Sequence, residues 1–143
     1  MIAACRRSVV GGLCALAFLT ACAAPPADLP PDVAVGKPEP MPTPRTEPND
    51  AVPDIVKMHF SSLDVRRGET WSGDFVTGTN VASVEVRTNL FSIDVPRTAY
   101  GRFHFELKVL DAPQIFVRSY RLRVIARNSA GIEFEQDLPF ELR

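Results

Sequence analysis

The chain has 143 residues and carries 16 basic and 17 acidic side chains, so its net charge is −1. That length leaves room for one domain of ordinary size with one hydrophobic core. A charge balance without a basic surplus argues against a general nucleic-acid-binding protein, which must displace counterions from phosphates.

The first 22 residues have the composition of a secretory signal. Arg6 and Arg7 precede an apolar run over residues 8–18, and small residues follow before Cys22. A charged start, a short apolar stretch and a small-residue end are typical of a cleaved signal peptide. The apolar run is shorter than the roughly 20 residues that span a bilayer comfortably. We therefore expect residues 1–21 to be a signal peptide.

The tetrapeptide Leu19-Thr20-Ala21-Cys22 resembles the lipobox of bacterial lipoproteins. The resemblance implies cleavage before Cys22 and a diacylglycerol on its thiol, which would hold the protein on a membrane of the cell envelope. Two or three acyl chains together give stable anchoring where one chain would be reversible. Ala23, and not Asp, follows the cysteine, which resembles the pattern sorted to the outer membrane in enteric bacteria.

The cysteines add a constraint on the rest of the chain. Cys5, Cys14 and Cys22 are the only ones, so a chain processed at Cys22 has no intramolecular disulfide. Its domain must be stabilised by the hydrophobic core alone.

Residues 22–53 are predicted to be the lipidated cysteine followed by a disordered, Pro-rich tether. Ten prolines fall between residues 24 and 53, and no aromatic residue is present there. Proline fixes φ and removes backbone donors, so neither a helix nor a central strand is expected. Thirty residues in polyproline geometry would hold the domain up to roughly 90 Å from the lipid. The alternative is that a Pro-x-x-Pro peptide in this range is itself a ligand for an aromatic groove.

Residues 54–143 alternate between apolar and polar side chains with a period of two, which predicts strands. The clearest strand runs over residues 102–109, and two more over residues 120–127 and 132–142 are joined by Asn128-Ser-Ala-Gly131 as a hairpin. Placing both apolar sets of the hairpin on one face sets its arginines opposite its acids on the other. Such cross-strand pairs contribute roughly 0.2 to 1 kcal/mol each. The residues in question are Arg121, Arg123 and Arg127 on one strand and Glu133, Glu135 and Asp137 on the other.

Four shorter strands are expected upstream, over residues 55–60, 71–77, 82–87 and 91–95. The total of seven short strands without any helical period predicts an all-β, two-sheet sandwich.

The run from Tyr120 to Gly131 resembles the penultimate strand and final turn of bacterial immunoglobulin-like and fibronectin-type domains. The resemblance implies a seven-stranded immunoglobulin-like sandwich with Tyr120 as its corner tyrosine, and with Asn128 and Gly131 in the final turn. Two features depart from the antibody branch of that family. Leu122 stands where the second cysteine would lie, and the only tryptophan, Trp71, is on the second expected strand.

No catalytic or metal-binding pattern is found, and we predict neither an enzyme nor a cofactor. His59 and His104 are the only histidines and are expected to be isolated surface residues. The spacings of the acids near strand ends match no calcium loop. These acids are Asp64, Asp74, Asp94 and Asp111.

The sequence supports two functional hypotheses. The first is a lipid-anchored interaction module that docks onto another envelope protein through an edge strand or through end loops. The second is a carbohydrate or peptidoglycan binder, for which Tyr100 and Phe116 are the candidate aromatic platform. The candidate docking loops are residues 61–68, 77–80, 88–90 and 111–115.

Overall fold

The computed structural model describes residues 29–110 and 113–143. The predicted signal peptide, Cys22 and Ala23 lie outside these residues, as does Asp111. The described chain contains a single turn of 3-10 helix, η1 (Gln114–Phe116), and ten strands in two sheets. The strands are β1 (Val33–Val35), β2 (Ile55–Phe60), β3 (Asp64–Val65), β4 (Thr70–Thr77), β5 (Val81–Arg87), β6 (Ser92–Val95), β7 (Arg97–Ala99), β8 (Arg102–Lys108), β9 (Arg118–Asn128) and β10 (Glu133–Leu142).

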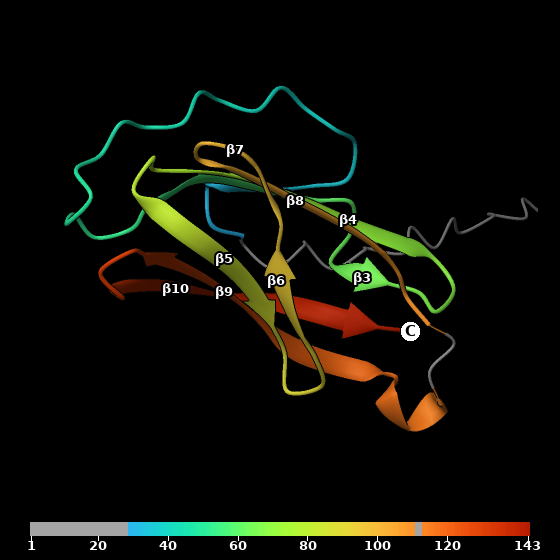
Figure 1. The fold of residues 1–143 in the computed structure, drawn as a ribbon. Coiled ribbons are helices and arrows are strands. Elements are labelled where there is room, and N and C mark those ends of the chain that lie inside the picture. Colours follow the sequence, from blue (N-terminus) through green and yellow to red (C-terminus); the bar gives the residue numbers. More distant parts are fainter. Residues whose placement is uncertain (1–28, 111–112) are drawn as a thin grey trace, which may run out of the picture.

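The two sheets pack face to face, and each has five strands (Figure 1). The first sheet has the order β1-β2-β4-β8-β7, and the second has the order β3-β10-β9-β5-β6. Both are mixed, because β1 runs parallel to β2 and β3 runs parallel to β10 while the other pairs are antiparallel. The predicted all-β, two-sheet architecture is confirmed.

All seven predicted strands are present, but the predicted count is too low. The three further strands are β1, β3 and β7. β1 lies in the Pro-rich range, β3 has only two residues, and all three residues of β7 are exposed, so none of them shows an apolar alternation.

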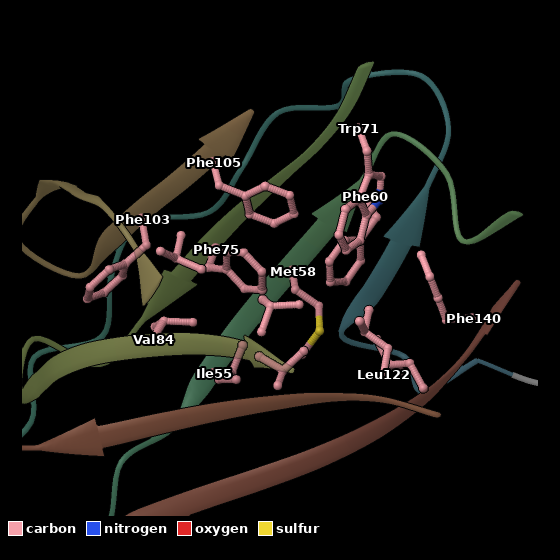
Figure 2. Close-up of a cluster of buried hydrophobic side chains, with 14 of the residues drawn as sticks. Ile55, Met58, Phe60, Trp71, Phe75, Val84, Phe103, Phe105, Leu122 and Phe140 are labelled. Carbon is pink, nitrogen blue, oxygen red and sulfur yellow. The ribbon is translucent and has the colours of Figure 1, made fainter. Parts of the chain in front are cut away.

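An aromatic cluster fills the core between the sheets (Figure 2). The indole of Trp71 on β4 lies 4.8 Å from the ring of Phe105 on β8 and 5.1 Å from the ring of Phe140 on β10, measured between ring centroids. The ring of Phe60 on β2 stacks beside it at 6.1 Å. The indole N–H donates to the Ser62 carbonyl at 2.9 Å, so the buried polar atom is satisfied.

The segment before β2 lies against the domain, and the prediction of a disordered tether is wrong for residues 29–53. Val33–Val35 pair with Met58–Phe60, and the backbone of Arg45 forms a bridge with Gly78. The Arg102 guanidinium donates to the Pro42 carbonyl at 3.0 Å. Figure 1 shows residues 36–53, which we call the strap, crossing over the sheet that contains β4 and β8.

Two asparagines fasten the end of the strap. The side-chain amides of Asn80 and Asn128 both donate to the Ala51 carbonyl, at 2.9 and 3.0 Å. The side-chain oxygen of Asn128 accepts hydrogen bonds from the backbone of Ala130 and Ile132, so one residue holds both the final turn and the strap. Proline has no backbone N–H, but its carbonyl oxygen can still accept a hydrogen bond. Donor groups of the domain can therefore bind backbone carbonyls along this segment.

The hydroxyl of Tyr120 donates to the Phe116 carbonyl at 2.7 Å, which joins the start of β9 to η1. Replacing Tyr120 with Phe removes this hydrogen bond and leaves the ring in place. We expect the free energy of unfolding to fall by about 1 kcal/mol, measured by urea denaturation. Tyr100→Phe is the matched control, because Tyr100 is 77% exposed and its hydroxyl has no protein partner among the described residues. Equal effects of the two substitutions would contradict the assignment.

Candidate functional site

An apolar groove of about 460 Å³ opens between β6 and the C-terminal half of β8. Three aromatic rings contribute to its lining, those of Phe91, Phe116 and Phe140. Leu110 lies at its border and is 81% exposed, and the nearby Ile115 is 76% exposed. The remaining lining residues are Leu90, Ile93, Leu107, Lys108, Val109 and Leu142. A cluster of exposed apolar side chains around an apolar hollow marks a binding surface more often than single exposed residues do.

The groove exists because β7 is short. β7 pairs with β8 only as far as Phe103, and the next hydrogen bond along β8 runs from the His104 N–H to the carbonyl of Pro96, the residue before β7, at 3.0 Å. Beyond that point no described strand pairs with β8 on its β7 side. β6 is likewise the edge strand of its sheet. Both strands that border the groove therefore present open backbone edges.

A second hollow lies beyond the end of β5, along the N-terminal part of β9 that β5 leaves unpaired, and has a volume of about 760 Å³. We call it the arginine hollow. It adjoins the groove, because Asn89 belongs to its lining and the next residue, Leu90, belongs to the lining of the groove. The full lining is Arg87, Thr88, Asn89, Arg118, Ser119, Tyr120, Arg121 and Arg123.

The predicted charge pairing across the β9–β10 hairpin is confirmed. Arg127 lies opposite Glu133 and contacts it at 2.5 Å, and Arg123 lies opposite Asp137 and contacts it at 3.0 Å. Arg121 is paired less closely, since its nearest carboxylate oxygen, on Asp137, is 3.5 Å away.

Glu85 adds a carboxylate from a third strand, β5, which the hairpin pattern could not reveal. It is only 7% exposed. Burial alone would raise the pKa of Glu85, but hydrogen bonds from Ser92, Arg127 and Arg87 outweigh burial and lower the pKa from 4.5 to about 2. The carboxylate is therefore ionised at neutral pH, and it holds Arg87 and Arg127 at 2.7 Å each.

The two histidines lie on either side of one carboxylate on the outer face of the other sheet. His104 Nδ1 is 2.8 Å from one oxygen of Asp74, and His59 Nδ1 is 3.8 Å from the other oxygen. His59 is only 5% exposed and its Nε2 faces the carbonyls of Gly36 and Lys37, so the expectation that it is a surface residue is wrong. Among the residues that the structure describes, no group of three or more His, Cys, Asp or Glu side chains is arranged to hold a metal ion.

Three of the four loops named from the sequence separate into two ends of the sandwich, and the fourth, residues 61–68, contains β3 and pairs with the end of β10. Residues 88–90 and the described part of 111–115 adjoin the groove, whereas residues 77–80 lie against the strap. Tyr100 and Phe116 do not form a joint platform. Tyr100 lies in the turn before β8 beneath the guanidinium of Arg97, and Phe116 lines the groove beyond the other end of β8.

Comparisons with models of known families, with curated proteins and with solved structures find no match to this chain. In the part of the chain that the structure describes, no helix has the length and apolar character needed to cross a membrane.

The pKa of Glu85 predicts how stability depends on pH. Because its pKa falls from 4.5 to about 2 on folding, its contribution is fully present above pH 4.5 and declines as the pH drops toward 2. The full contribution is on the order of 3 kcal/mol. Urea denaturation of wild type and Glu85→Gln should show a large stability difference at pH 7 that shrinks by pH 3. Glu135→Gln, whose side chain is 44% exposed, is the control and should change little. A Glu85→Gln curve parallel to that of the wild type would refute the assignment.

Proposed function

We propose that this protein is a lipid-anchored envelope lipoprotein whose domain is an immunoglobulin-like, non-catalytic module for binding another envelope protein. The apolar groove between β6 and β8 is the observation that carries the proposal. The signal-like residues 1–21 and the lipobox-like sequence ending at Cys22 support the anchor.

The strand order supports an immunoglobulin-like fold. When the additional strands β1, β3 and β6 are set aside, the strand orders of the two sheets are β2-β4-β8-β7 and β10-β9-β5. This order corresponds to strands A-B-E-D and G-F-C of an immunoglobulin constant-type domain. The hydrogen bond from Tyr120 to a carbonyl four residues upstream is also the contact of a tyrosine corner. The departure is Trp71, which lies on the second strand of that order, where antibody domains carry their tryptophan on the third.

The groove fits an extended segment of a partner protein. Open backbone edges on β6 and β8 offer hydrogen bonds to such a strand, and the apolar lining offers space for its alternate side chains. Among the described residues that line the groove, Lys108 is the one charged side chain, and an apolar lining of this kind favours binding of a partner segment. Carbohydrate binding has less support, because Tyr100 and Phe116 lie apart.

The lipid anchor is tested by expressing the full chain in a bacterial host that processes lipoproteins, beside a Cys22→Ser variant. We expect the wild type to lose residues 1–21, to gain the mass of its acyl chains and to enter the detergent phase. The variant should do none of these. Intact mass and detergent partitioning report both properties. Identical behaviour of the two proteins, without lipid, would disprove the anchor and leave the groove untouched.

The docking site is tested by placing a photo-crosslinking amino acid at position 110, beside the groove, in the source organism. The matched control is position 52 in the strap, since Val52 is 63% exposed and lies at the other end of the sandwich. We expect one discrete protein adduct from position 110 and none from position 52. A second substitution, Leu90→Asp, places a charge at the border of the groove and should abolish the adduct. Adducts of equal yield from both positions would count against the groove.

A further inference from the structure

The arginine hollow contains four arginines, and nearby carboxylates form close ion pairs with only two of them. Arg87 is held by Glu85, and Arg123 is held by Asp137 and Glu135. The two other arginines of the hollow, Arg118 and Arg121, have no close carboxylate partner of their own among the described residues.

The contacts of Arg121 and Arg118 leave most of their N–H donors unused. Arg121 is 73% exposed at its side chain, and its one carboxylate contact is the 3.5 Å approach to Asp137, which Arg123 already holds. The guanidinium of Arg118 lies over the ring of Tyr120, 5.2 Å from the centroid, and forms no ion pair within residues 29–110 and 113–143. A guanidinium on an aromatic face keeps its N–H donors in its own plane, where they stay free for an oxygen ligand.

Neutral donors complete the hollow. Thr88 Oγ1 accepts hydrogen bonds from the backbone N–H groups of Leu90 and Phe91, at 3.1 and 3.3 Å. Its own O–H therefore remains available to donate. Ser119 and Asn89, whose side chains carry further donors, also belong to the lining.

We propose that the arginine hollow binds a ligand through a phosphate group. A phosphate presents three acceptor oxygens and up to two negative charges, which matches two arginine forks and the hydroxyl groups better than the two oxygens of a carboxylate do. The volume of about 760 Å³ leaves room for the group to which the phosphate is esterified. This site lies along the N-terminal part of β9 beyond the end of β5 and does not depend on protein docking in the groove between the sheets.

The phosphate has two possible sources, a soluble phosphate compound or a lipid headgroup. Leu90 and Val117 are each 38% exposed and are chain neighbours of the lining residues Asn89 and Arg118, and exposed apolar residues beside cationic ones are typical of a surface that meets lipid. The experiment separates the two sources.

The full chain in micelles of an uncharged detergent is titrated with inorganic phosphate and with glycerol phosphate, and separately with phosphatidylglycerol added to the micelles. Binding is followed through the side-chain Nε–Hε NMR signals of its arginines. We expect the signals of Arg118 and Arg121 to shift in a saturable way. The double variant Arg118→Gln/Arg121→Gln should weaken binding at least about tenfold. The variant Arg118→Lys/Arg121→Lys keeps both positive charges but lacks the planar guanidinium groups that can bind two oxygens at once. Its affinity should lie between that of the wild type and that of the double Gln variant.

Arg45→Gln is the control for a general effect of charge, because it removes one positive charge beside Gly78, beyond the opposite end of β5, where each single variant Arg118→Gln or Arg121→Gln removes one in the hollow. Saturation by soluble phosphate supports the site with a soluble source, and saturation by phosphatidylglycerol alone supports it with a lipid source. Binding to neither probe, or an equal loss in the double variant and in Arg45→Gln, would overturn the proposal. Both overturning results leave the groove and the lipid anchor standing.

Discussion

The packing of Trp71 is the interaction on which the two sheets depend. Its indole contacts Phe60 and Phe105 within its own sheet and Phe91 and Phe140 from the facing side, and it is only 1% exposed. No cysteine follows residue 22, so hydrophobic packing of this kind replaces an inter-sheet disulfide. Phe91 and Phe140 also line the apolar groove, so the contacts that join the sheets fix part of the groove's lining as well.

The sequence predicted the strands whose side chains alternate, because burial on one face imposes a period of two. It also predicted that the arginines of β9 face the acids of β10, since keeping both apolar sets inside places both charged sets on the other face. The individual pairs, such as Arg123 with Asp137, depend on the register and come from the structure. The groove could not be predicted. Phe91, Leu107 and Val109 look like ordinary core positions in the sequence, and they line a groove only because β7 stops pairing with β8 at Phe103. That stop is a property of the tertiary structure.

The partners of the arginines are set by the tertiary structure as well. Alternation identifies which of them face solvent, but it does not reveal which of them have partners. Glu85 reaches Arg127 from a different strand, and Arg118 meets a tyrosine ring instead of an acid. Predicting these contacts requires the neighbours of β9 on both sides, and one of those neighbours, β5, is more than 30 residues earlier in the sequence.

The docked strap changes the reach of the domain. A free tether ending at residue 53 would have allowed a separation of roughly 90 Å from an anchored Cys22. With residues 29–53 bound to the sandwich, only residues 23–28 separate that cysteine from the folded part, and they can span at most about 25 Å. If Cys22 carries a lipid, the folded domain therefore stays within a thin layer next to the bilayer. A partner protein would have to lie in, or extend into, that layer to bind it.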